Sequence, residues 1–421
     1  MLVKNSVKDY DLVINMERPK RRKPKRPNIF FRTLLKVVSA PDLLATKFKV
    51  EKIGMEKLPK DTPALFLMNH SSFIDLEIAA STLYPRPFNI VTTLDGFIGK
   101  DWLMRQIGCF PTRKFVTDIG LIKDINYCIK KNNTSVLMYP EAGYSFDGRA
   151  TVLPESLAPF IKRLGAPVVM IETFGSFHRK PLYNELKARK VPVSAQIRYL
   201  LSPEDISTKS TEDIASILRE QFSFDAFRWQ QQSGLKISED FRADGLQRLL
   251  YKCPACGAER KTVGKGIHLE CLACHKKWEL TEDGFMRATE GKTEYAHIPD
   301  WYEWERNCVT KEIADGQYAF CEDVDVYMIV NTKGVYKVGG GKLEHSVDGF
   351  RLTGCDGKLD YTQKSISLYT VNADFYWYKL GDVISIGNMD ALYYCIPKDS
   401  TVPVTKVRLA TEEIYKALKN K

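Results

Sequence analysis

Residues 64–75 read ALFLMNHSSFID, an apolar run that ends at a histidine and leads into a polar turn. The run 64–69 is typical of a buried strand, and the residues that follow the turn have helical spacing. The same alternation continues along the chain: further apolar runs lie at 135–140, 167–172 and 193–200, and helical patterns lie at 76–84 and 117–131. Strands that alternate with helices predict a layered α/β domain.

A histidine and an aspartate follow this first run at a spacing that suits acid–base chemistry. If the chain turns into a helix after His70, Asp75 comes back within reach of the imidazole. A carboxylate bonded to one ring nitrogen fixes the tautomer and leaves the other nitrogen as a general base for a hydroxyl. The other five histidines lack an aspartate at this offset. A histidine that only caps a helix is the structural alternative.

Three further motifs follow in order: GCFPTR at 108–113, YPEAGYS at 139–145, and an apolar run that begins at Pro167. Together with NHSSFID at 69–75, these four blocks resemble those of the glycerolipid, or 1-acylglycerol-3-phosphate, acyltransferase family. That family has N-H-x4-D, then G-x-x-x-x-R, F-P-E-G-T-R-S, and a hydrophobic run with a proline. The resemblance covers about 120 residues, roughly 30% of the chain.

The resemblance implies a glycerolipid-acyltransferase-like domain of layered sheet and helices. It implies an O-acyltransferase of phospholipid biosynthesis that moves a fatty acyl group to a lysophospholipid acceptor. The acyl donor would be acyl-CoA or acyl-carrier protein, as a co-substrate. His70 would deprotonate the acceptor hydroxyl, which then attacks the thioester carbonyl, and Asp75 would orient and charge-stabilise His70.

The resemblance also implies a set of substrate-binding residues. Arg113 would hold a phosphate of the acceptor, since a guanidinium meets phosphate oxygens bidentately and stays charged. Glu141 would position the head group or bond the motif loops together, and Pro167 would shape the acyl or carrier surface. Asn69 of the first block and Ser145 of the third block are also expected to contact the substrate.

The third block departs from the family pattern. Tyr144 stands where the family has a second phosphate-binding arginine, and a tyrosine donates one hydrogen bond but supplies no charge. Arg149 either reaches back to compensate or is an arginine of a surface turn. The head group of the acceptor is therefore left open.

Two C-x-x-C pairs predict a metal module. Each pair forms a knuckle whose two thiolates face one ion, so two pairs complete a tetrahedron. The ligands would be Cys253, Cys256, Cys271 and Cys274, holding a structural zinc in a small zinc ribbon. The alternatives are an iron centre and free thiols. Covalent haem, suggested by the histidine after the second pair, is disfavoured by the upstream pair.

The positive charge of the chain is concentrated near its N-terminus. The formal net charge is +10, and seven positive charges lie within residues 18–26, which leaves only +3 for the rest. An apolar stripe at helical spacing follows, made by Phe30, Phe31, Leu34, Leu35 and Val38. This pattern favours either an interfacial membrane helix or a helix packed on its own domain.

These observations predict four regions. Residues 1–50 would be a basic tail and a membrane-surface helix, 51–235 the acyltransferase domain, 236–295 a linker and zinc ribbon, and 296–421 a β-rich domain. Short aromatic and β-branched runs after about residue 300 indicate this all-β unit, with a PH-like barrel as the topology guess and one closing helix from Thr411.

No apolar run approaches the length of a membrane span, and residues 1–16 lack the apolar core of a secretory signal. We therefore expect a peripheral protein on the cytoplasmic face of a membrane. Its expected partners are the lysophospholipid acceptor, an anionic membrane surface and acyl-carrier protein, and no nucleic acid. The rival hypothesis is a nucleic-acid- or protein-binding zinc-ribbon protein whose acyltransferase-like domain is inactive.

Overall fold

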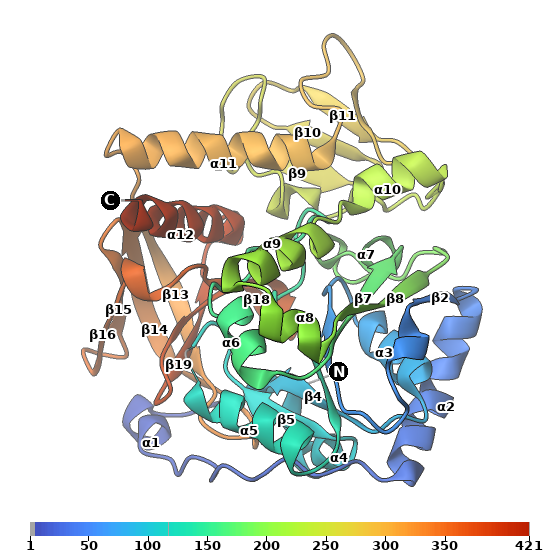
Figure 1. The fold of residues 1–421 in the computed structure, drawn as a ribbon. Helices are drawn as coiled ribbons and strands as arrows, with labels where there is room; N and C mark the ends of the chain where they lie inside the picture. The colour runs from blue at the N-terminus through green and yellow to red at the C-terminus, as the bar shows by residue number, and fades with distance from the viewer. Residues whose placement is uncertain (1–4, 117, 421) are drawn as a thin grey trace. The chain divides into compact units, whose positions relative to one another are not determined.

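The structure is a computed structural model that describes residues 5–116 and 118–420 (Figure 1). The chain divides into two compact units. Residues Lys20–Pro181 and Lys187–Trp229 form the first, called the α/β unit below. The second, the β-rich unit, contains Met1–Pro19, Leu182–Leu186 and Gln230–Lys421. The ribbon region and the β-rich region thus belong to one unit, which also takes in the first residues of the chain.

A seven-stranded sheet forms the centre of the α/β unit. Its strands are β2 (Lys49–Ile53), β3 (Leu65–Met68), β4 (Phe88–Thr93), β5 (Cys109–Thr112), β6 (Ser135–Met138), β7 (Val168–Phe174) and β8 (Ser194–Leu201). The strand order is β2-β8-β7-β3-β6-β4-β5, and every neighbouring pair is parallel except β7 with β8. Since β3 and β6 are neighbours, the segments that follow them meet at one edge of the sheet.

Successive side chains of β3 point alternately to the two faces of this sheet, and each face is covered by its own set of helices. Phe66 and Met68 pack into one apolar cluster together with α2 (Ile29–Ala45) and α3 (Ile74–Leu83). Leu65 and Leu67 pack into the opposite cluster, which is covered by α5 (Ile119–Lys130), α6 (Leu157–Leu164) and α9 (Thr211–Gln221). Because both faces are buried, the strands read as continuous apolar runs, and the predicted layered α/β architecture is confirmed.

Shorter helices complete this unit: α4 (Asp101–Gln106), α7 (Ser176–Arg179), α8 (Pro203–Thr208) and the first half of α10 (Ala226–Ser233), which crosses the boundary between the units. Helix α9 begins with a capping box at Ser210. Its hydroxyl accepts from the Asp213 amide at 3.0 Å, and the Asp213 carboxylate accepts from the Ser210 amide in return. The predicted helix at 117–131 corresponds to α5, and Thr117 lies outside the described residues.

The basic N-terminal region is not the free tail that its composition suggests. Residues Asn5–Val7 form β1, which pairs in parallel with a strand of the β-rich unit, and α1 (Tyr10–Ile14) follows. Further on, Arg21 forms ion pairs with Asp118 and Asp124 of the α/β unit. The segment is held by hydrogen bonds and ion pairs together with a few buried apolar side chains, such as Val13 and Pro24, which its composition does not reveal. Residues 1–4 lie outside the described part.

The β-rich unit begins with a small antiparallel sheet. Strands β9 (Thr262–Lys265), β10 (His268–Cys271), β11 (Lys277–Leu280) and β12 (Met286–Ala288) lie in the order β12-β11-β10-β9. The long helix α11 (Ile298–Ala314) follows. This helix corrects the expectation that the chain beyond residue 300 is all-β up to its last helix. Trp301 and Val309 of α11 are fully buried, so the helix is a core element.

The rest of the unit is an eight-stranded sheet with a helix after it. Strands β13 (Phe320–Met328), β14 (Val335–Ser346), β15 (Gly349–Gly354), β16 (Leu359–Lys364), β17 (Asn372–Trp377), β18 (Gly381–Gly387) and β19 (Leu392–Pro397) lie in the order β16-β15-β14-β13-β19-β18-β17, with β1 beside β14. The last helix, α12, spans Val404–Lys419. It begins seven residues before the expected cap at Thr411, whose hydroxyl instead bonds the Val407 carbonyl.

A search of residues 5–116 and 118–420 for a helix with the length and apolarity of a membrane span finds none.

Candidate functional site

His70 and Asp75 form the centre of the site, and the start of α3 brings them together. Nδ1 of His70 lies 3.1 Å from Oδ2 of Asp75. The carboxylate accepts the Nδ1 proton, which leaves Nε2 as the basic nitrogen. The His70 side chain is 22% exposed, so the imidazole can meet a substrate. The predicted pairing of these two residues is thus present in the structure.

The carboxylate of Asp75 is fixed by backbone donors. Its Oδ2 atom also accepts from the amides of Ser71, at 2.7 Å, and Ser72, at 3.0 Å. The side chain is fully buried. Three hydrogen bonds to one oxygen thus hold the carboxylate in a fixed position beside the imidazole.

Two tyrosine rings contact the imidazole of His70. The centroid of Tyr139 lies 4.1 Å from that of His70 in a stacked arrangement, and Tyr144 lies at 4.2 Å, tilted by 37°. Phe73 in turn meets Tyr144 edge-on. Burial, and then the negative charge of Asp75, raise the pKa of Tyr139 well above its usual value. The Tyr139 hydroxyl therefore stays neutral, and its ring restricts the position of the His70 imidazole.

Glu141 connects the loops around the site. Its Oε1 atom accepts from the His70 amide at 3.2 Å, and Oε2 accepts from the Thr151 amide at 2.7 Å. The side chain is only 2% exposed. Of the two roles implied for this residue, the geometry agrees with the one in which it bonds the motif loops together.

Ser145 and Asn69 also hold the loops in place. The amide of Ser145 donates to the His70 carbonyl at 3.1 Å, and its hydroxyl donates to the Arg149 carbonyl at 2.5 Å. Oδ1 of Asn69 accepts from the amide of Thr173 at 2.9 Å, at the end of β7. Both side chains are buried, so they shape the site from behind.

A small hollow of about 10 Å³ lies beside the imidazole. It is lined by Asn69, His70, Ser71, Glu141, Ser145, Gly148, Arg149, Ala150, Glu172, Gln221, Phe222 and Phe224. Arg149 contributes a cation here, and its Nε donates to Asp147 at 2.6 Å. Glu172 contributes a carboxyl whose pKa is raised by burial, against the opposing effect of Arg198.

Sequence patterns did not single out several of these residues. Glu172 is the polar end of the apolar run 167–172, which is a signal that could have identified it. Phe222 and Phe224 follow α9 and carry no motif. Tyr139 occupies the first position of the third block, where its aromatic character was visible but its contact with His70 was not.

Four of the expected site residues do not line the hollow: Asp75 and Tyr144 contact the His70 side chain, whereas Arg113 and Pro167 lie elsewhere. Arg113 follows β5, which is three strands away from β3 in the sheet, a lateral distance of roughly 14 Å. Pro167 is buried at the start of β7, where its carbonyl accepts from the Leu65 amide. It therefore lies at the strand ends opposite to those that carry His70.

Comparison with known proteins agrees with this geometry. The sequence profile of the acyltransferase family matches residues 49–171, which contain all four motifs. This stretch is therefore similar to an acyltransferase domain. Two curated relatives are the chloroplastic 1-acyl-sn-glycerol-3-phosphate acyltransferases BAT2 of Brassica napus, 28% identical over 141 residues, and LPAT1 of Arabidopsis thaliana, 27% identical over 143 residues. Both alignments cover 33% of this chain.

The chain spans about two fifths of the length of these relatives, 41% of BAT2 and 39% of LPAT1. Among solved structures, the crystal structure of the 1-acyl-sn-glycerophosphate acyltransferase PlsC from Thermotoga maritima is similar at 17% sequence identity and a TM-score of 0.35. That match covers 45% of this chain and 78% of the other.

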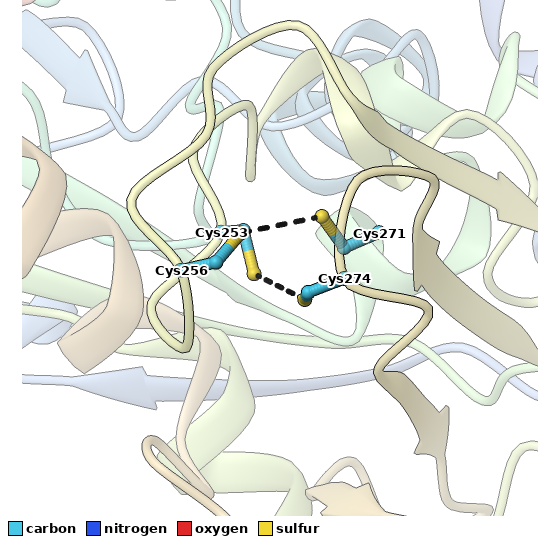
Figure 2. A group of neighbouring side chains, drawn as sticks. All are labelled: Cys253, Cys256, Cys271 and Cys274. Carbon is cyan, nitrogen blue, oxygen red and sulfur yellow. Dashed lines mark hydrogen bonds between the residues drawn. The ribbon is translucent and has the colours of Figure 1, made fainter.

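The four predicted cysteines lie together outside the acyltransferase domain (Figure 2). Their Sγ atoms all lie within 4.8 Å of one another, with Cys253 3.7 Å from Cys274 and Cys256 3.8 Å from Cys271. All ten cysteines of the chain fall in the described part, and none is in a disulfide.

The spacing of these sulfur atoms suits a tetrahedral ion. A metal–sulfur distance of about 2.3 Å gives tetrahedron edges of roughly 3.8 Å, close to both measured pairs. The knuckles also share one backbone pattern: Gly257 donates to the Cys253 carbonyl and His275 to the Cys271 carbonyl, each at 2.8 Å. The residues present therefore fit a four-thiolate metal centre.

The loop that contacts His70 contains a non-glycine residue with a positive φ. Ala142 has φ +55°, a left-handed conformation that costs a non-glycine residue roughly 1–2 kcal/mol. The family motif has glycine at this position. We expect Ala142→Gly to raise the free energy of unfolding by about 0.5–1 kcal/mol, since the greater freedom of glycine in the unfolded chain offsets part of the relief. Thermal denaturation measures the difference.

The matched control is Ala215→Gly, within α9, where glycine is expected to lower stability by about 1 kcal/mol. An unchanged or lower melting temperature for Ala142→Gly would contradict the assigned strain.

Proposed function

We propose that the protein transfers a fatty acyl group from an acyl thioester to a hydroxyl of a lysophospholipid at a membrane surface, in phospholipid biosynthesis. The observation that carries the proposal is the His70–Asp75 pair, held at a strand end beside a hollow and inside an acyltransferase domain. The acceptor supplies the nucleophile, so the protein needs only a base, an orienting carboxylate and binding groups.

The pair acts as base and orienter in this mechanism. Nε2 of His70 takes the proton of the acceptor hydroxyl while its oxygen attacks the thioester carbonyl. Asp75 accepts a hydrogen bond from Nδ1–H and stabilises the imidazolium that forms. When the tetrahedral intermediate collapses, the carbon–sulfur bond breaks, and His70 returns the proton to the departing thiolate. The products are the ester and the free thiol of the carrier.

Binding of the acceptor phosphate is proposed for Arg149, with Arg113 as a second cation. Tyr144 contacts the imidazole and carries no charge, so it does not replace the family arginine. Arg149 lines the same hollow as His70, which supports this role for it. Arg113 follows the more distant strand β5. Glu141, Ser145 and Asn69 maintain the loops of the site.

We expect Arg149→Gln to raise the KM for lysophosphatidate by about 10–100-fold, because a charge-assisted hydrogen bond contributes roughly 1.5–3 kcal/mol. The KM for an uncharged monoacylglycerol should barely change, and Arg149→Lys should recover part of the loss. Acyl transfer is read by mass spectrometry, with acyl-CoA and acyl-carrier protein as parallel donors.

Arg163→Gln, on the exposed side of α6, is the control for loss of charge alone. Equal losses for the charged and the uncharged acceptor would remove Arg149 from phosphate recognition. Absence of transfer by the unaltered protein with every donor and acceptor would overturn the proposed function.

Peripheral attachment at the cytoplasmic face of a membrane is part of this proposal. Helix α2 packs on the domain by one side, through Leu43, and leaves apolar side chains exposed on the other. The exposed set is Ile29, Phe30, Leu34, Val37, Val38 and Leu44. An apolar stripe next to a basic segment is typical of an interfacial helix, so it supports attachment to an anionic surface.

For the β-rich unit we propose a structural zinc in the four-cysteine centre and a PH-like barrel in β13–β19 with α12. Four thiolates leave no open coordination position, which favours a structural ion over a catalytic one. The barrel assignment is supported by a four-strand meander, β13 to β16, a three-strand meander, β17 to β19, and one closing helix.

A further inference from the structure

The basic segment, residues 20–27, is docked on the α/β unit in a defined position. Nε of Arg21 donates to Asp124 at 2.9 Å, and Nη1 donates to Asp118 at 2.9 Å. The guanidinium lies over the first turn of α5, where a Cβ at Gly120 would clash with it. One of the seven clustered cations is therefore used to attach the segment to the unit.

Backbone and proline contacts complete this docking. Pro24 and Pro27 are buried, although the segment is otherwise exposed. The side-chain amide of Asn89 donates to the Lys25 carbonyl at 2.7 Å, and the Lys23 ammonium lies over the ring of Tyr127. The remaining cations are thus presented from a fixed backbone and not from a flexible tail.

A cavity of about 100 Å³ separates the docked segment from α4, and we call it the head-group cavity. It is lined by Arg22, Lys23, Pro24, Lys25, Asp101, Trp102, Arg105, Gln106 and Cys109. The one acidic group, Asp101, accepts from Arg105 at 3.0 Å. Within the described part of the chain, Arg22, Lys23 and Lys25 have no ion pair with an acidic side chain.

The walls of this cavity determine what could occupy it. Its volume accommodates several water molecules, or one phosphate group in their place. Guanidinium and ammonium groups on a fixed backbone bind phosphate oxygens through charge-assisted hydrogen bonds. Three cations that lack acidic partners therefore favour an anion of phosphate chemistry.

The surroundings of the cavity point to a lipid as the source of that phosphate. Trp102 is 66% exposed, and its neighbour Leu103 is 42% exposed. Phe31 of α2 meets the Trp102 ring edge-on at 5.9 Å, and the adjacent Phe30 is exposed. Tryptophan beside apolar side chains and cations is the composition that lies at the level of lipid head groups.

We propose that the head-group cavity binds the phosphate of an anionic phospholipid, with Trp102 in the membrane interface. The proposal rests on the membrane attachment proposed above. The cavity is distinct from the acyl-transfer site: Cys109 begins β5, whereas His70 follows the end of β3, and the intervening strands are parallel. The two sites therefore lie at opposite edges of the sheet, so this lipid is a ligand and not the acceptor.

Two matched double variants distinguish binding at a discrete site from general electrostatic attraction of the basic segment to an anionic membrane. Arg22→Gln with Lys25→Gln removes two cations from the cavity, and Lys20→Gln with Arg26→Gln removes two exposed cations of the same segment that do not line it. The full chain is sedimented with vesicles of phosphatidylcholine, with and without about one third phosphatidylglycerol. Binding to the anionic vesicles should fall at least about tenfold further for the cavity pair. Equal losses for the two pairs would overturn the discrete site.

The source of the phosphate is tested by tryptophan fluorescence, with Trp102→Phe to assign the signal. A soluble short-chain phosphatidylglycerol should give a saturable change that inorganic phosphate does not give at the same concentration. An equal response to inorganic phosphate, or tighter binding of single-stranded DNA that the cavity pair abolishes, would overturn a lipid occupant. Acyl transfer by the unaltered protein is measured separately, so failure of the proposed function is distinguished from failure of this site.

Discussion

Replacing His70 by alanine is expected to lower kcat for acyl transfer by about 10²–10⁴-fold, with little change in KM. The imidazole is the only group in the hollow that combines a basic nitrogen with a buried orienting carboxylate, among the residues described. Without it, the acceptor hydroxyl has to attack as a neutral alcohol. Acyl transfer to lysophosphatidate under saturating conditions measures the effect.

The Asp75→Asn variant tests the role of the orienting carboxylate separately from that of the base, His70. An asparagine oxygen can still accept from the Ser71 and Ser72 amides, but the charge that stabilises the imidazolium is lost. A fall in kcat of similar size is expected, with an intact fold. His268→Ala, at a half-buried histidine of β10, is the control for loss of an imidazole elsewhere. If the His70→Ala variant keeps its fold and most of its activity, the assignment of the base is wrong.

Local spacing made part of this site predictable from the sequence. His70 and Asp75 are separated by a single turn, so a strand that ends and a helix that begins are enough to bring them together. The cysteine knuckles are equally local, since each hydrogen bond that closes a knuckle joins residues four positions apart. Features of this kind depend on the conformation of only a few consecutive residues, so sequence patterns predict them well.

Contacts that depend on strand order were not predictable in the same way. Glu141 reaches the His70 amide because β6 lies beside β3, and no local pattern contains that neighbourhood. Docking of the basic segment depends on Asp118 and Asp124, which lie 97 and 103 residues after Arg21. The same limit applies to α11, whose aromatic and β-branched residues favour strands locally but are buried here on a helix.

The four-cysteine centre leads to the second prediction with a large effect. We expect one tightly bound zinc per chain by elemental analysis, and its loss in the Cys271→Ser variant. A structural site that folds its own module contributes its binding free energy to stability, and in small zinc modules this amounts to about 10–16 kcal/mol. Loss of one ligand should therefore destabilise the β-rich unit by several kcal/mol, which chelation of the unaltered protein should reproduce.

The contacts of the first knuckle, around Cys253, indicate which part of the β-rich unit would be affected by loss of the metal. The Lys252 amide, next to Cys253, donates to Glu305 at 2.8 Å, and the Trp301 indole donates to the Lys252 carbonyl at 3.0 Å. Unfolding of the module should thus expose Trp301, giving a red shift in tryptophan fluorescence at temperatures where the unaltered protein is native. Cys321→Ser, at an exposed cysteine of β13, should keep both the metal and the spectrum. The structural role would be wrong if the unaltered protein bound no metal, or if Cys271→Ser were as stable as the control; the cysteines would then be free thiols. Iron in place of zinc would change the identity of the ion but not its structural role.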